Sequence, residues 1–172
     1  EVEEAHPFDT YAFSRIRQAV DSANLAVREY ALHRPDEARG AGSTVTMALL
    51  NDTRAYIANV GDSRTYLLRD NYLTLLTRDH SLVAELLSAG RITPKEAIDH
   101  PQSNLITRCL GYMDQVEADI TTHELQSGDC LLLCSDGLWD EVREPEMMVR
   151  IIQSAPDLEI VARRLVQAAN HA

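Results

Sequence analysis

Residues 43–77, STVTMALLNDTRAYIANVGDSRTYLLRDNYLTLLT, decide the fold of this 172-residue chain. Four short runs rich in β-branched, aromatic and aliphatic residues are separated by turn-forming pairs at 51–52 (Asn-Asp), 61–62 (Gly-Asp) and 70–71 (Asp-Asn). This spacing predicts an antiparallel meander of four strands. Several runs are apolar on both alternating faces, so we expect the sheet to be covered on both sides.

Helical periodicity precedes these strands. Over residues 9–32 the apolar side chains recur three and four positions apart, which predicts one face of an amphipathic helix. Asp9 or Thr10 is suited to cap its first turn. The polar segment 33–42, HRPDEARGAG, is typical of a loop.

The elements expected after the strands follow the same local signals. Gly90 is placed to end a short helix, and Thr93 with Glu96 forms a capping-box pattern around Pro94. The expected elements are a helix over 81–89, a helix from 93, strands over 116–125 and 130–135, and two helices starting near 145 and 157. This order predicts a single α+β domain over residues 1–172, a four-layer α-β-β-α sandwich with antiparallel sheets.

Composition narrows the class of partner. Lys and Arg total 16 against 27 Asp and Glu, a formal net charge of −11, and a phosphate backbone requires a basic surface instead. No apolar run approaches the roughly 20 residues that span a bilayer, and no basic-then-apolar leader opens the chain. We therefore expect neither nucleic acid nor membrane as a partner.

The cysteines indicate a reducing compartment. Cys109, Cys130 and Cys134 are odd in number and contain no CxxC pair, which argues against a disulfide framework and against a zinc site. We expect a cytoplasmic location.

Two acidic residues lie where chemistry is expected. Asp136 ends the apolar run that begins at Cys130, and Asp62 lies in the turn between the second and third predicted strands. A carboxylate at the mouth of a buried strand is costly unless a cation or hydrogen bonds compensate it, and Mg²⁺ and Mn²⁺ favour such oxygen ligands. The alternative is that each Asp caps its own turn. Taken singly, each position favours the turn cap.

A set of short motifs is more specific than either carboxylate alone. The motifs are GST at 42–44, ANVGDSR at 58–64, DHS at 79–81, HPQSNLITR at 100–108, LG at 110–111 and LCSDGL at 133–138. In order and spacing they resemble the motifs of the phosphatase 2C family of metal-dependent (PPM-type) serine/threonine protein phosphatases, over about residues 40–140, and 100–108 resembles bacterial members especially. The resemblance implies a β-sandwich flanked by helices, in agreement with the predicted layers.

The resemblance also implies roles for individual residues. Asp136 corresponds to the aspartate of the family's SDG motif, a catalytic ligand of paired Mn²⁺ or Mg²⁺ ions. Asp62 corresponds to the aspartate of the GDSR motif, which together with Asp136 holds a third, weaker metal ion, and Asp140 is a further candidate ligand there. Residues 82–104 correspond to the flap, a mobile insertion that influences substrate choice.

The implied reaction is hydrolysis of phosphoserine and phosphothreonine in proteins by a metal-activated water, which counteracts a serine/threonine kinase. Phosphorylated proteins, including a cognate kinase, are the expected partners. His80 and His100 lie in motifs and are expected to be structural. The family's opening DGxGG and closing GGxDN motifs have no match in the chain. We therefore expect a domain cut at both ends, with exposed strand edges through which copies self-associate.

Three alternatives belong to other classes. The missing motifs leave open a pseudophosphatase or regulatory module that binds phosphoproteins without catalysis. An esterase with Ser63 as nucleophile needs a His oriented by Asp, and no Asp precedes a His by three residues. A cysteine phosphatase needs CxxxxxR, and no Cys precedes an Arg by six residues. The two other enzyme classes therefore have no support.

Overall fold

The computed structural model describes residues 8–171, in which helices flank two small sheets. The elements in chain order are α1 (Asp9–His33), β1 (Val45–Asn51), β2 (Arg54–Val60), β3 (Arg64–Arg69), β4 (Tyr72–Leu75), α2 (Leu82–Ser88), α3 (Pro94–Ile98), β5 (Asp119–Glu124), β6 (Cys130–Cys134), α4 (Asp136–Trp139), α5 (Pro145–Ser154) and α6 (Leu158–Ala169).

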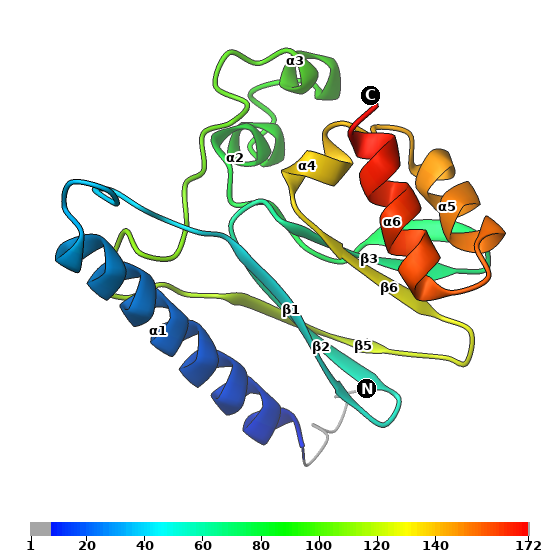
Figure 1. The fold of residues 1–172 in the computed structure, drawn as a ribbon, viewed down its shortest axis with the longest axis horizontal. Coiled ribbons are helices and arrows are strands. Elements are labelled where there is room, and N and C mark those ends of the chain that lie inside the picture. The colour runs from blue at the N-terminus through cyan, green and yellow to red at the C-terminus, as the bar shows by residue number, and fades with distance from the viewer. Residues whose placement is uncertain (1–7, 172) are drawn as a thin grey trace.

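Two three-stranded antiparallel sheets, ordered β1-β2-β5 and β4-β3-β6, form the centre of the molecule (Figure 1). The α+β class with antiparallel sheets is therefore confirmed. The predicted four-strand meander is wrong at its middle turn, because the chain passes from one sheet to the other between β2 and β3. Both sides of β2 are already paired, with β1 and with the distant β5, and a local pattern does not reveal that pairing.

The outer two of the three predicted turns do close hairpins. Asn51 pairs with Arg54 across the first, and Arg69 pairs with Tyr72 across the second. In the second turn Asp70 and Asn71 have φ of 49° and 69°, the left-handed conformation that a two-residue hairpin turn of this kind requires and that Asn and Asp tolerate.

Helix α1 packs against the sheet that contains β2. The predicted apolar face is confirmed from Phe13 to Val27, whereas Tyr30 at its end is 51% exposed. The buried residues of this core are Ala12, Ile16, Val20, Tyr56, Ala58, Val60 and Leu110. The cap prediction is wrong, because Phe8 occupies the N-cap position and Asp9 is already helical. The Asp9 carboxylate instead accepts hydrogen bonds from Tyr56 Oη at 2.7 Å and from Arg54 Nη1 at 3.2 Å.

Helices α5 and α6 pack against the other sheet, on the opposite side of the molecule from α1 (Figure 1). Their buried side chains, with Val142, are Met148, Val161 and Leu165, and Leu73 and Leu132 pack against them from the sheet. The run at 130–135 is not a buried central strand as expected. It forms β6, an outer strand that pairs with β3 on one side alone, and its Leu133 is 40% exposed.

The segment between β4 and β5 carries two short helices, α2 and α3. Gly90, with φ of 64°, follows α2 as predicted, and the capping box of Thr93 and Glu96 starts α3. Neither helix has a buried residue. Within residues 8–171, no helix has the length and apolar character needed to cross a bilayer.

Candidate functional site

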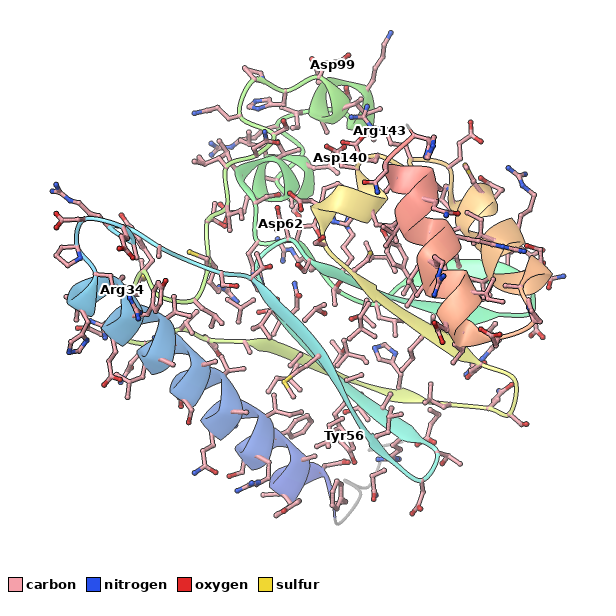
Figure 2. All side chains as sticks on the ribbon, viewed as in Figure 1. Arg34, Tyr56, Asp62, Asp99, Asp140 and Arg143 are labelled. Carbon is pink, nitrogen blue, oxygen red and sulfur yellow. The ribbon has the colours of Figure 1, made fainter. Side chains whose placement is uncertain are left out.

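A cavity of about 420 Å³ lies where α2 and α3 face the β2–β3 turn and α4. Four acidic residues from three parts of the chain line it: Asp62, Asp79, and Asp136 and Asp140 at the two ends of α4. Figure 2 shows Asp62, Asp140 and Arg143 around the short helix α4, with Asp99 further out beside α3. The structure therefore brings all three sequence-predicted site residues to one cavity.

The turn that carries Asp62 is held by hydrogen bonds from three directions. The Gly61 amide donates to His80 Nδ1 at 3.0 Å, and Asn59 Nδ2 donates to the Gly61 carbonyl at 3.0 Å. The Trp139 indole N–H donates to the Asp62 carbonyl at 3.0 Å. Because these bonds engage backbone atoms, the Asp62 carboxylate is left to face the cavity.

His80 supports this turn from outside the cavity. Its ring is buried, and Nε2 lies 3.1 Å from Asp119 Oδ2. Since Nδ1 accepts a hydrogen bond from the Gly61 amide, the ring proton is on Nε2, which donates a hydrogen bond to Asp119. Burial raises the pKa of Asp119, but the hydrogen bonds from His80 and Arg108 outweigh it and the pKa is lowered.

Arg64 and Trp139 are site residues to which the sequence reasoning assigned no role. Arg64 Nε and Nη2 donate to the Asp79 carboxylate at 3.0 Å and 2.7 Å, and Nη1 donates to Tyr66 Oη at 3.2 Å. The guanidinium also lies over the Trp139 ring, with Cζ 3.5 Å from its centroid, in a cation–π contact. The available signal was the GDSR motif itself, in which Arg64 is the fourth residue.

Asp136 is the first residue of α4 and follows β6 by two positions. Its Oδ1 accepts a hydrogen bond from the Gly137 amide at 2.9 Å. Asp140 lies at the end of α4, where its Oδ1 is 3.1 Å from Arg143 Nη2. Asp140 therefore faces the cavity with its charge already paired.

The electrostatics connect Asp62 with Asp136. Burial, and after it the negative charge of Asp136, raises the pKa of Asp62 above its ordinary value. Among the described residues neither carboxylate forms an ion pair, since Arg64 is paired with Asp79 and Arg143 with Asp140. Two carboxylates without an ion-pair partner among the described residues, one from a turn and one from α4, thus line one cavity.

This pair suits a hard cation that keeps most of its water. Mg²⁺ is commonly bound through one or two carboxylates while several water ligands remain. Within residues 8–171, no group of three His, Cys, Asp or Glu side chains is arranged to hold a metal ion. Two carboxylates alone match only that sparse kind of coordination, and the roles of Asp62 and Asp136 as metal ligands stay predictions.

Comparison with known proteins gives one consistent result. The family model for protein phosphatase 2C matches residues 7–172. The serine/threonine phosphatase stp of Listeria monocytogenes is 41% identical over 155 residues, which is 90% of this chain and 61% of that protein.

Solved structures agree with the sequence relatives. The structure of the serine/threonine phosphatase Stp1 from Staphylococcus aureus superposes with a TM-score of 0.85 at 34% identity, over 98% of this chain and 66% of that one. The catalytic domain of the phosphatase PstP in complex with two manganese ions has a TM-score of 0.79 at 38% identity, over 92% and 64%. The chain thus spans about two thirds of the length of the relatives that it matches.

Proposed function

This chain belongs to the protein phosphatase 2C family, and from that premise we propose that it serves the hydrolysis of phosphoserine and phosphothreonine in proteins. The observation that carries the proposal is the pair Asp62 and Asp136, two carboxylates without a cationic partner among the described residues that line one cavity. Bacterial relatives named as serine/threonine phosphatases support it.

Mn²⁺ or Mg²⁺ is the proposed cofactor. Asp136 and Asp62 would hold the ion, and Asp140 would join them after release from Arg143. When bound, such ions activate water and neutralise phosphate oxygens. The structure of the related phosphatase PstP in complex with two manganese ions supports this choice.

Residues 82–104 are the proposed flap beside this site. Its side chains Val83, Leu87 and Ile98 give the cavity an apolar wall opposite the carboxylates. An apolar wall beside a phosphate-binding point suits an extended phosphopeptide, which offers both kinds of surface. We accordingly expect phosphorylated proteins, among them a cognate kinase, as partners in the cytoplasm, and an α-β-β-α sandwich as the complete domain.

A second candidate is a regulatory module that binds phosphoproteins without hydrolysing them. It is favoured by one observation, the lack of any three-residue metal-ligand group within residues 8–171. Hydrolysis needs an activated water molecule, whereas binding of a phosphoprotein needs only the cavity between α2, α3 and α4.

The deciding experiment measures Mn²⁺-dependent release of phosphate from a phosphothreonine peptide, by this chain and by a chain extended with the family's remaining motifs. We expect activity in the extended chain that Asp136→Asn abolishes and Asp36→Asn, an exposed loop residue with the same charge change, leaves intact. Peptide binding without phosphate release from the extended chain would favour the regulatory module.

A further inference from the structure

The geometry points to Arg64 as a positioning residue that fixes the Asp62 turn against helix α4 and so sets the relative placement of Asp62 and Asp136. This inference rests on the proposed function only in assigning a cation to the two carboxylates. The mechanical part stands on contacts that involve no metal ion.

The two carboxylates belong to different parts of the fold. Asp62 lies in the turn between β2 and β3. Asp136, the first residue of α4, lies 74 residues further along the chain. Backbone pairing joins these parts only indirectly, through the partnership of Arg64 with Cys134 at the end of the β3–β6 ladder. Beyond that pair, contacts of side chains join the turn to the helix at the site itself.

Arg64 makes that connection at its side-chain end. The guanidinium lies 3.5 Å from the centroid of Trp139, the last residue of α4, and the same indole donates to the Asp62 carbonyl. Asp79, which follows β4, holds the other side of the guanidinium through two of its nitrogens. These three residues, Arg64, Trp139 and Asp79, thus form a clamp.

The clamp explains why Arg64 does not act on substrate or compete with a cation. Nε and Nη2 are engaged by Asp79, and Nη1 donates to Tyr66 Oη, so the fork that would bind a phosphate is occupied. Asp79 neutralises its charge, and only 22% of the Arg64 side chain is exposed. Hydrogen bonding to Asp79 overcomes the opposing effect of burial and raises the pKa of Arg64, so this charge does not titrate in the working range.

The chain provides a matched control on the same strand. Arg69, at the other end of β3, makes the same two-nitrogen contact with Asp129, at 2.9 Å and 2.6 Å. Arg64→Lys and Arg69→Lys therefore both keep the charge and both lose the planar fork. Only the first change touches the clamp.

The test without metal is amide hydrogen exchange of this chain, followed residue by residue by NMR. In Arg64→Lys we expect exchange at residues 61–64 and 136–140 to quicken about tenfold, the factor for losing one charge-assisted hydrogen bond. In Arg69→Lys the quickening should instead occur around Asp129. Equal effects of the two variants at the site, or none, would overturn the clamp. If Arg64→Lys does not fold, Trp139→Phe tests the same link, because it keeps a ring for stacking and removes the donor to Asp62.

The test with metal is the affinity for Mn²⁺, measured from the electron paramagnetic resonance signal of the free ion. Arg64→Lys should raise the dissociation constant about tenfold at equal folded fraction, while Arg69→Lys leaves it unchanged. If amide exchange becomes faster in Arg64→Lys but the affinity for Mn²⁺ does not change, the clamp does not serve to place the two carboxylates for a cation. A wild-type chain that binds no Mn²⁺, with Asp62→Asn and Asp136→Asn indistinguishable from it, would count against the proposed cofactor, and the exchange result would still decide the clamp.

Discussion

At the residue scale, Gly61 is the point on which the site depends. Its φ of 107° lies in the region that side chains other than glycine rarely adopt. A Cβ built there would meet Thr44 Cγ2 at 2.3 Å and Thr44 Cβ at 2.6 Å. The close approach of Thr44, the residue before β1, to the turn thus requires glycine for two independent reasons, conformation and space.

We therefore expect Gly61→Ala to lower the free energy of unfolding by about 3 kcal/mol, the sum of backbone strain and overpacking. Urea denaturation measures this change. Gly128→Ala is the control, since Gly128 has a φ of 95° but no atom within 4 Å of its Cβ position. It should cost only the strain, about 1 kcal/mol. Equal losses in the two variants would show that Thr44 moves aside.

Asp62 illustrates the energetic conflict of a half-buried carboxylate that lies near a second carboxylate. Burial and the charge of Asp136 raise its pKa, so the folded chain holds the proton more tightly than the unfolded chain does. A group with a raised pKa contributes its full stability below the unfolded pKa, about 3.9 for Asp, and this contribution is lost as pH rises through the folded value.

Accordingly, Asp62→Asn should be more stable than the wild type at pH 7 in EDTA, and the difference should shrink as the pH is lowered through the titration of Asp62. Thermal unfolding at a series of pH values measures it, with Asp36→Asn as the charge-matched control that shows no such trend. Addition of Mn²⁺ should favour the wild type over Asp62→Asn. A variant less stable than the wild type at pH 7 without metal would mean that Asp62 makes a favourable contact as an anion.

At the element scale, two helices with the same kind of N-cap hydrogen bond have very different anchoring. The Asp157 carboxylate caps α6 by accepting from the Ile160 amide at 2.8 Å, and Val161 and Leu165 of that helix are buried in the core beside β6. The Thr93 hydroxyl caps α3 in the same way, with the Glu96 amide at 3.3 Å, but α3 has no buried residue. The same local bond therefore serves a core helix in one case and a surface segment in the other.

Asp157→Ala should lower the global free energy of unfolding by about 1 kcal/mol, the usual effect of losing an N-cap. Thr93→Ala should leave the global value nearly unchanged and instead quicken amide exchange within residues 93–99, because α3 opens without the core. Denaturation and hydrogen exchange on both variants provide the comparison. A global loss from Thr93→Ala as large as that from Asp157→Ala would show that the segment is coupled to the core.

At the scale of the whole molecule, the sheets end in open strands. β1 and β6 are each outermost in their sheet, and Leu133 of β6 is 40% exposed. Outer strands present unpaired backbone groups that can recruit another chain. The net charge of −11 opposes association but is screened beyond about 8 Å at physiological salt.

We therefore expect the chain to self-associate as concentration and salt increase, and Leu133→Lys to shift it toward monomer by placing a charge on the outer strand. Analytical ultracentrifugation measures the distribution. The control is Leu158→Lys on α6. Leu158 is 71% exposed and belongs to a helix, so this change adds the same charge without altering an outer strand. A wild-type chain that remains monomeric at high concentration and salt would contradict the prediction.

Local sequence patterns predicted the elements that depend on interactions between residues close together in the chain. The spacing of Phe13, Ile16 and Val20, the pair Asp70-Asn71 and the capping box at Thr93 each act within a few residues, and the structure contains the helix, the hairpin and the cap that they predict. The motif resemblance likewise selected Asp62, Asp136 and Asp140, and the structure places all three in the lining of one cavity. Their roles as metal ligands remain predictions.

What the sequence by itself determined was therefore the fold class, the family and the residues that meet. Only the tertiary structure decided that the chain changes sheets at Gly61, that β6 is an outer strand, and that Arg64 links Asp79 to Trp139. Each of these depends on partners far apart in the chain, such as β2 with β5. Such pairings are selected by the packing of the whole molecule, because neither partner carries a local signal of the other.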